Sequence, residues 1–199
     1  MTLYTLKPRF QNLTRPIAAW LAGIGVTANQ VTLTAGVLSI LVGALLCLPG
    51  RGPMLFLILP VWLFVRMALN AIDGMLAREF GQKSRLGGYL NELCDIVSDA
   101  ALLLPFAFVA PFAAWTVFLV IFLAALSEYA GAMSPLVGAS RRYDGPLGKS
   151  DRALVLGALG AWIGFGWSLP SWIFWLMPAL AVLLAVTAAN RIYRGLQER

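Results

Sequence analysis

Three long stretches of the chain contain no charged residue, and they limit the possible folds more than any other feature. They run from Pro16 to Gly50, from Ala100 to Ser127 and from Ala153 to Asn190. A helix needs about 20 apolar residues to cross the hydrocarbon layer of a membrane, so the last stretch has room for two such helices. Only 12% of the residues are charged, against about 25% in soluble domains. The sequence therefore predicts a polytopic membrane protein rather than an ordinary soluble domain.

Turn-forming residues divide the apolar sequence into six predicted spans. Backbone groups cannot stay unpaired in lipid, and these stretches are too long for the strands of a barrel, so the spans must be helices. The expected fold class is an all-α integral membrane protein, with residues 1–199 forming a single domain. The predicted spans together cover residues 29–191 and are separated by Pro and Gly residues; they comprise residues 29–49, 54–77, 88–110, 112–134, 150–168 and 171–191.

Residues 1–26 precede the first span and contain a periodic apolar pattern. Apolar side chains recur at steps of three and four, with polar residues on the other faces, at Leu6, Phe10, Leu13, Ile17 and Leu21. This pattern is typical of an amphipathic helix that lies along the membrane surface. A helix packed on the bundle is the alternative.

The basic residues predict how the chain is oriented. With six spans both termini lie on one side, and of the 15 Lys and Arg residues all but Arg51 and Arg66 fall on that side. Because basic residues concentrate in cytoplasmic loops, we expect cytoplasmic termini in a bacterial inner membrane, with membrane lipids and no nucleic acid as partners. Cys47 and Cys94 fall near opposite membrane faces, so we expect no disulfide between them.

Polar side chains gather on the second and third spans, where they are energetically costly and therefore candidates for function. They lie one helical turn apart on one face of each span, as Arg66, Asn70 and Asp73 on the second and Asn91, Asp95 and Asp99 on the third. Folding the two spans into an antiparallel hairpin brings these residues to matching levels. Asp73 then lies level with Asn91, Asn70 with Asp95, and Arg66 with Asp99.

The two inner levels of this hairpin suggest a metal site at the cytoplasmic end. Asn70, Asp73, Asn91 and Asp95 supply four oxygen ligands, which suit a hard cation such as Mg²⁺ that shares its coordination with substrate phosphates. Helix-to-helix hydrogen bonding is the alternative role for these residues. For Asp99, neutralising Arg66 within the bundle is favoured over a role in catalysis.

These residues also resemble the signature of the CDP-alcohol phosphotransferase family, D-x-x-D-G-x-x-A-R-x8-G-x3-D-x3-D. Every spacing is met and six of the eight fixed positions match, at Asn70, Asp73, Gly74, Ala77, Arg78, Gly87, Asn91 and Asp95. The segment from Thr27 to Thr32 is similar to the T-P-N-x-x-T stretch that opens the first span in the family, with Ala28 in place of proline. The family architecture, six spans after an N-terminal surface helix, covers the whole chain.

The resemblance implies transfer of a phosphatidyl group from CDP-diacylglycerol to an alcohol, with release of CMP, in phospholipid biosynthesis. It also implies a cytoplasmic active site, Mg²⁺ or Mn²⁺ as cofactor and a homodimer. Asp95 is then the base that takes the proton of the acceptor, and Asn70, Asp73, Asn91 and Asp95 hold the cation. The CDP group is expected on Asn29, Thr32, Asp73, Gly74, Ala77, Arg78 and Gly87.

Two positions depart from the family pattern. Asn70 and Asn91 stand where the family has aspartates, and each substitution keeps a carbonyl oxygen but removes a negative charge. We expect weaker cation binding, with a single tightly held Mg²⁺. The alternative is a homologue that binds CDP-lipid or nucleotide without turnover. Because six motif positions persist, catalysis is the favoured interpretation.

The acceptor alcohol stays open on the sequence. Lys149 and Arg152, at the predicted start of the fifth span, are equally candidates for binding an acceptor phosphate and for contacting anionic lipid headgroups. Arg141 and Arg142 are expected to contact lipid headgroups. Family members that use phosphorylated polyols often carry a Y-x-R-x-R-like stretch near the end of the fourth span, and no arginine occurs there. Glu128 in that region is expected to bind acceptor hydroxyls, to face an amine or to pair with Arg66.

Overall fold

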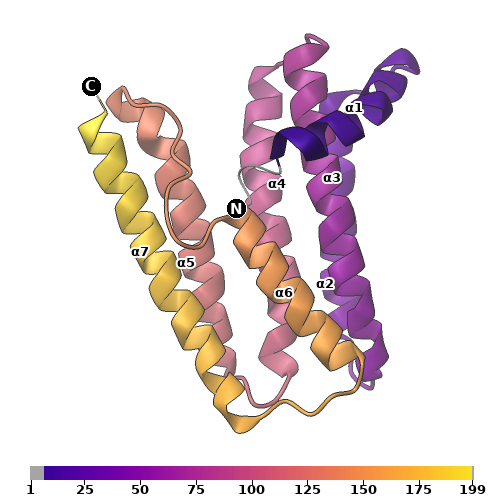
Figure 1. The fold of residues 1–199 in the computed structure, drawn as a ribbon, viewed down its shortest axis with the longest axis vertical. Helices are drawn as coiled ribbons and strands as arrows, with labels where there is room; N and C mark the ends of the chain where they lie inside the picture. Colours follow the sequence, from indigo (N-terminus) through magenta and orange to yellow (C-terminus); the bar gives the residue numbers. More distant parts are fainter. Residues whose placement is uncertain (1–6, 199) are drawn as a thin grey trace.

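The computed structural model describes residues 7–198, with side chains from Phe10 onward, and its regular structure there is helical. Leu6, the first residue of the predicted apolar pattern, lies outside the described residues. In the described part of the chain, helix α1 is followed by a bundle of six further helices (Figure 1). These helices are α1 Lys7–Gly23, α2 Ala28–Cys47, α3 Ile58–Glu79, α4 Arg85–Leu103, α5 Ala114–Met133, α6 Lys149–Gly164 and α7 Leu176–Gln197. Short 3₁₀ helices precede α3 and α7 and follow α4 and α5.

Four helical segments are long and apolar enough to cross a membrane. They are Ala28–Cys47, Pro53–Glu79, Ala114–Val137 and Ser171–Gln197. Large apolar side chains cover their outer surfaces, including Val37, Phe64, Phe122 and Val182, which are between 53% and 63% exposed. Such a surface is stable only against lipid, so the chain is an integral membrane protein. The other two bundle helices differ: α6 has only 16 residues, and α4 carries Arg85, Glu92, Asp95 and Asp99.

The start of α4 differs from the sequence prediction. The sequence placed a break at Gly87 and Gly88, but α4 begins at Arg85 and contains both glycines. Ser84 caps the helix, because its Oγ accepts a hydrogen bond of 2.9 Å from the Gly87 amide. A side-chain cap of this kind offsets the low helix propensity of the glycines in the first turn.

Helix α1 packs on α3 through small side chains and leaves its larger apolar side chains uncovered. Thr14 and Ala18 are buried at 4% and 0% exposure, whereas Leu13, Ile17 and Trp20 are 72%, 48% and 63% exposed. Figure 1 shows α1 lying across one end of the bundle at a steep angle to α3. The helix therefore has one face for the bundle and a second, apolar face that is free to contact lipid.

Helix α2 is the element against which both polar helices pack. It contacts α3 and, more extensively, α4, whereas α3 and α4 make little direct backbone contact with each other. Close approach to α4 depends on two glycines: a Cβ on Gly43 would lie 2.2 Å from the Ala101 carbonyl oxygen, and one on Gly36 would lie 3.2 Å from Cys94 Sγ. The polar stripes of α3 and α4 are thus held apart by a distance that side chains can bridge.

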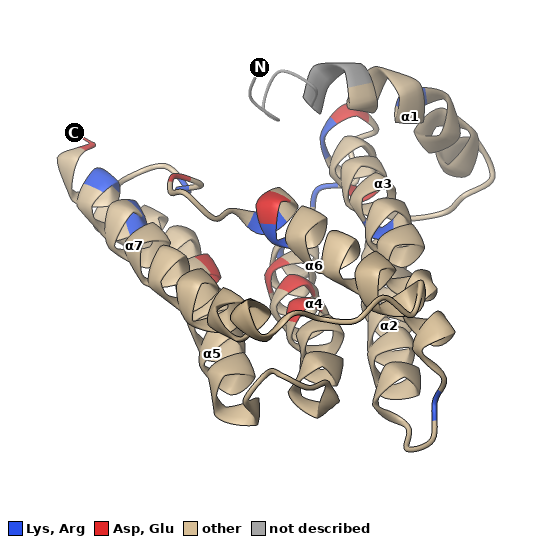
Figure 2. Cartoon of the chain, turned by 60° about the horizontal axis from the view of Figure 1, so that its bottom comes forward, with Lys and Arg blue, Asp and Glu red and all other residues tan. Residues whose placement is uncertain are grey.

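The remaining helices complete the bundle on the other side of α4. Helix α5 packs on α7, α6 packs on α3, and α4 also contacts α5. Figure 2 shows long uncharged segments on the bundle helices, with charged segments concentrated toward the ends near α1 and the C-terminus. The charged side chains that lie inside the bundle come from α3, α4, α5, α6 and α7, and they define the candidate site.

Candidate active site

The start of α2 contributes the first part of the site. Thr27 caps the helix, accepting a hydrogen bond from the Gln30 amide while the Gln30 side chain accepts one from the Thr27 amide. One turn later, Thr32 Oγ1 donates a hydrogen bond of 2.7 Å to Asp73 Oδ2 on α3. Both side chains are buried, with 8% and 5% exposure. The hydroxyl therefore orients a carboxylate that has little access to water.

Two motif glycines leave room for polar side chains. A Cβ on Gly87 would lie 2.7 Å from Asn29 Oδ1, so the Asn29 carboxamide occupies the space that a larger residue would fill. A Cβ on Gly74 would lie 2.6 Å from Arg78 Nη2, so the Arg78 guanidinium lies against the backbone of its own helix. The residues expected to bind CDP thus lie on the ends of α2, α3 and α4 that meet near α1.

The two polar stripes meet at two of the three expected levels. Asn70 Nδ2 lies 3.5 Å from Asp95 Oδ1, and Arg66 Nη1 lies 2.5 Å from Asp99 Oδ1. At the third level no direct contact joins Asp73 to Asn91 within the described residues, because Asp73 turns toward α2. The pairing of Arg66 with Asp99 supports the structural role that the sequence favoured for Asp99.

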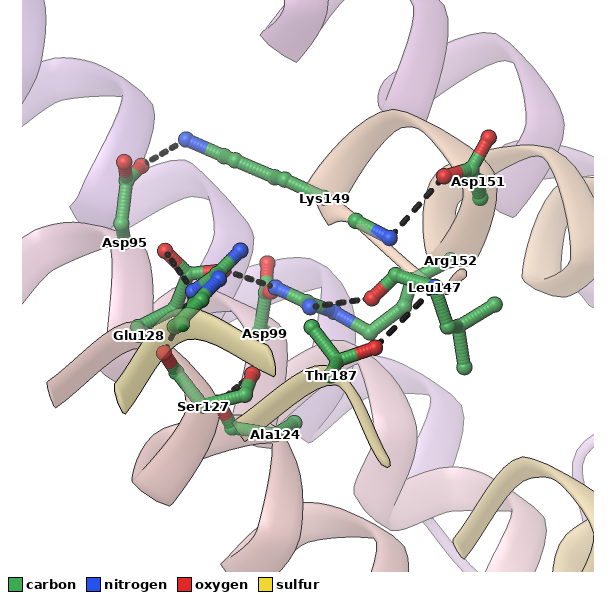
Figure 3. A network of polar contacts seen from close by, with 12 residues as sticks. Asp95, Asp99, Ala124, Ser127, Glu128, Leu147, Lys149, Asp151, Arg152 and Thr187 are labelled. Atoms are coloured by element: carbon green, nitrogen blue, oxygen red, sulfur yellow. Dashed lines mark hydrogen bonds and ion pairs between the residues drawn. The ribbon is translucent and has the colours of Figure 1, made fainter. Parts of the chain in front are cut away.

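Asp95 lies where α3, α4 and α6 come together. Lys149 Nζ, at the first residue of α6, forms an ion pair with Asp95 Oδ1, and Figure 3 shows the lysine reaching across to α4. Arg66 Nη2 lies 3.4 Å from the same oxygen and donates a 3.2 Å hydrogen bond to the Asp95 carbonyl. Three nitrogen groups, including the Asn70 amide, therefore surround one oxygen of this carboxylate.

Arg152 joins the α4 stripe to α5 and is 4% exposed. Its Nη2 lies 2.7 Å from Asp99 Oδ2 and 2.9 Å from Glu128 Oε1, as Figure 3 shows. Glu128 was expected to contact acceptor hydroxyls or an amine, or to pair with Arg66. The structure pairs it not with Arg66 but with Arg152, and also with Arg141 and Arg191.

Three residues of the ion-pair cluster around Glu128 were not assigned to a site from the sequence. They are Arg191, Arg141 and Glu92. Arg191 is 2% exposed and lies 3.4 Å from Glu128; it was counted only as a flanking basic residue. Arg141, expected to contact lipid, forms ion pairs with Glu92 and Glu128, and Glu92 was given no role from the sequence. A signal for Arg191 was present, because it continues the buried face of α7, which contains Leu180, Leu184, Thr187, Ala188 and Arg191.

The loop between α5 and α6 covers the end of the cluster. Arg142 donates hydrogen bonds to Asp144 Oδ2 at 2.8 Å and to Glu198 Oε2 at 2.6 Å, so it joins the loop to the end of α7. This arginine also holds the pKa of the Asp144 carboxyl below its usual range. Gly131 lets the backbone of the loop approach α5, since a Cβ there would lie 2.4 Å from the Arg142 carbonyl oxygen. Arg142 therefore fixes the loop rather than lining the site.

The polar groups of the motif are compatible with a divalent cation. Within the described residues, no group of three His, Cys, Asp or Glu side chains is arranged to hold a metal ion. The candidate donors are instead the carboxylates of Asp73 and Asp95 with the amide oxygens of Asn70 and Asn91. Oxygen donors of this kind suit Mg²⁺ or Mn²⁺, and a buried carboxylate oriented by Thr32 is a plausible ligand on chemical grounds.

The fold and this arrangement define a membrane-embedded helical bundle with a polar site near one end, and sequence comparison identifies its class. A sequence model of the CDP-alcohol phosphatidyltransferase family matches residues 25–187. The chain therefore belongs to the CDP-alcohol phosphatidyltransferase family.

Individual relatives extend this result. The chain is 48% identical over 194 residues to the inner membrane protein YnbA of Escherichia coli K12, covering 96% of this chain and 94% of the relative. It is 26% identical to the archaetidylinositol phosphate synthase of Pyrococcus horikoshii, over 77% of this chain and 79% of that protein. The crystal structure of Mycobacterium tuberculosis phosphatidylinositol phosphate synthase with CDP-DAG bound has the same fold, with a TM-score of 0.75, 22% identity and coverage of 94% and 95%.

Proposed function

We propose that this protein transfers a phosphatidyl group from CDP-diacylglycerol to an alcohol and releases CMP. The observation that carries the proposal is the pair of facing polar stripes on α3 and α4, which hold the spaced motif of the family. Asp73 is oriented by Thr32, and Asp95 lies opposite Asn70. Membership of the CDP-alcohol phosphatidyltransferase family supports the reaction class.

In this proposal Asp95 accepts the proton of the acceptor hydroxyl. The alcohol oxygen forms a bond to the β-phosphorus of the donor, and the bond from that phosphorus to the bridging oxygen breaks, so that CMP leaves with the electron pair. Proton transfer to a positioned carboxylate typically contributes about 10²–10⁴-fold to the rate. Lys149 and Arg66 hold the Asp95 side chain at the junction of α3, α4 and α6.

The CDP group is proposed to bind where α2, α3 and α4 meet near α1. Asn29 and Arg78, beside Gly87 and Gly74, would offer polar contacts to the nucleotide, and Ala77 leaves space on the same face. The cation site would comprise Asn70, Asp73, Asn91 and Asp95. When bound there, Mg²⁺ or Mn²⁺ would neutralise the negative charge of the diphosphate. A second crystal structure of Mycobacterium tuberculosis phosphatidylinositol phosphate synthase, in complex with manganese and citrate, supports a divalent cation in proteins of this fold.

The proposed membrane arrangement has six spans, α2 to α7, with both termini and the site on the cytoplasmic side. Helix α1 would lie in the membrane interface, since Leu13, Ile17 and Trp20 are exposed on it. The name of the Escherichia coli relative supports an inner-membrane location. Reporter fusions at Gly50 and at the C-terminus would test the orientation, because the account places them on opposite sides. Crosslinking in membranes would test the proposed homodimer.

The experiment that tests the activity is lipid analysis after overexpression. Cells that express the protein should accumulate one phospholipid class, identified by mass spectrometry, that cells expressing Asp95→Asn lack. Asp144→Asn is the matched control, because it makes the same chemical change in a loop residue outside the site. Equal lipid profiles for all three strains would contradict the proposal.

Binding of CDP-lipid without turnover is the alternative function, and the family match and the named synthases do not favour it. The charges of the motif are the feature from which it was expected. Asn70 and Asn91 lack the two negative charges that the family aspartates carry at these positions, and the Lys149 ammonium group forms an ion pair with Asp95. This alternative predicts that purified protein binds CDP-diacylglycerol but releases no CMP with any alcohol.

A further inference from the structure

The buried charges around Glu128 constrain the kind of acceptor that the proposed reaction takes. Three arginines from three different segments converge on this one carboxylate. Arg152 of α6 lies 2.9 Å from Oε1, while Arg191 of α7 and Arg141 of the α5–α6 loop lie 3.4 Å and 3.7 Å from Oε2. Glu128 itself is 6% exposed. A set of converging guanidinium groups is the arrangement with which proteins bind phosphate, and here a side chain of the same chain fills it.

The rest of the connected cluster leaves little unbalanced positive charge. Its ion pairs join five basic side chains to four acidic ones, which are Arg66, Arg141, Lys149, Arg152 and Arg191 with Glu92, Asp95, Asp99 and Glu128. A phosphate monoester carries a charge of about −1.5 to −2 at neutral pH. Burying that charge here would require breaking pairs that already neutralise one another, and a buried charge without a partner is strongly destabilising.

The space beside Arg152 and Lys149 is too small for a phosphate. The cavity that Arg66, Asp99, Lys149 and Arg152 line has a volume of about 10 Å³, which is room for a single water molecule at most. Arg191 has further partners, because its Nε and Nη1 donate hydrogen bonds to the Asp144 and Ser127 carbonyl oxygens. The anion position among these arginines is therefore already occupied.

We infer that the acceptor is an alcohol without a phosphate group, because Glu128 occupies the anion position that a phosphorylated acceptor would need. This inference rests on the proposed transferase function and adds the chemical class of its second substrate. The hydroxyl of the acceptor reaches Asp95, while the Glu128 cluster closes the inner wall of the site. A neutral alcohol meets no charge penalty there.

The test compares matched pairs of acceptors on the purified protein with CDP-diacylglycerol and Mg²⁺ or Mn²⁺. Glycerol is paired with glycerol 3-phosphate, inositol with inositol 1-phosphate, and serine with phosphoserine, and both CMP and lipid products are measured. At least one unphosphorylated acceptor should react with a kcat/KM at least tenfold above that of its phosphorylated partner. Inorganic phosphate at 10 mM should leave that rate unchanged.

Glu128→Gln supplies a second measurement, with Asp144→Asn as the control. Removing the carboxylate frees the guanidinium groups, so the preference within each pair should shift at least tenfold toward the phosphorylated acceptor. The wild-type comparison stands even if this variant fails to fold. CMP release by the wild type only with phosphorylated acceptors would overturn the inference and leave the transferase function intact. If none of the acceptors supports CMP release, the transferase function is contradicted, and the inference with it.

Discussion

Thr32 Oγ1 lies 2.7 Å from Asp73 Oδ2, and this hydrogen bond joins the start of α2 to the polar stripe of α3. The two residues are 41 positions apart in the sequence, yet both belong to the segments that resemble the family signature. Because Asp73 is 5% exposed, its carboxylate depends on this hydroxyl for one of its few polar contacts. The signature is therefore one connected structure rather than two independent motifs.

Replacing Thr32 tests that connection. Thr32→Val removes the hydroxyl and keeps the shape, whereas Thr32→Ser keeps the hydroxyl. A hydrogen bond to a charged group contributes about 1.5–3 kcal/mol, so kcat/KM for CDP-diacylglycerol should fall roughly ten- to a hundredfold in Thr32→Val. Thr32→Ser should stay within about threefold of the wild type. Equal losses in both variants would show that packing rather than hydrogen bonding matters at this position.

Gly43 should be essential for the packing of α2 on α4. A Cβ there would lie 2.2 Å from the Ala101 carbonyl oxygen, so Gly43→Ala must push the helices apart. We expect a loss of at least about 1–3 kcal/mol in the free energy of unfolding, seen as a lower Tm in detergent. Gly88→Ala is the control, because a Cβ there meets nothing within 4 Å; its Tm should stay equal or rise. A normal Tm for Gly43→Ala contradicts the packing.

The end of α7 should loosen in acid. A hydrogen bond from Arg142 lowers the pKa of Asp144, and hydrogen bonds from Ser140 and then Arg142 lower the pKa of Glu198. Groups whose folded pKa is lowered stabilise the fold above their ordinary pKa, near about 4, and lose this effect as the pH falls through the folded value. Amide exchange in residues 191–198, corrected for its intrinsic pH dependence, should rise from pH 6 to pH 3. Arg142→Gln should reduce that difference, with the hydrogen bond from Ser140 to Glu198 accounting for what remains.

Restoring the family aspartates should strengthen cation binding. Asn70→Asp with Asn91→Asp adds two carboxylates to the proposed donor set, and affinity for hard cations increases with ligand charge. The Kd for Mn²⁺, measured by electron paramagnetic resonance, should fall roughly tenfold or more. Asn190→Asp, at an exposed position of α7, should leave it unchanged. An unaltered Kd in the double variant would show that Asn70 and Asn91 do not face the cation.

Much of the fold follows from the sequence because lipid imposes simple rules. The charge-free stretches and the Pro and Gly breaks gave helix positions within a few residues of α2, α3, α5 and α6. The last predicted span, 171–191, begins in the 3₁₀ helix Ser171–Trp175 and ends before α7 does. The start of α4 was wrong because Gly87 was interpreted as a break, whereas its small size makes room for Asn29. That contact is between distant segments and leaves no local pattern.

The site could be predicted only where it follows helical periodicity. Arg66 with Asp99 and Asn70 with Asp95 were matched by one-turn spacing on two adjacent helices. The partners of Glu128 come from α6, α7 and a loop, and their positions depend on how three segments pack. Spacing along α7 places Arg191 on the buried face, but it carries no information about which carboxylate the arginine meets, so its pairing with Glu128 was missed.

CMP release by the purified protein tests the central claim most directly. With CDP-diacylglycerol, Mg²⁺ and a panel of alcohols, the wild type and Asp144→Asn should release CMP at similar rates. Asp95→Asn should be slower by about 10²–10⁴-fold, the contribution of a general base. Release that is absent with every alcohol, or that is unchanged in Asp95→Asn, would contradict the account.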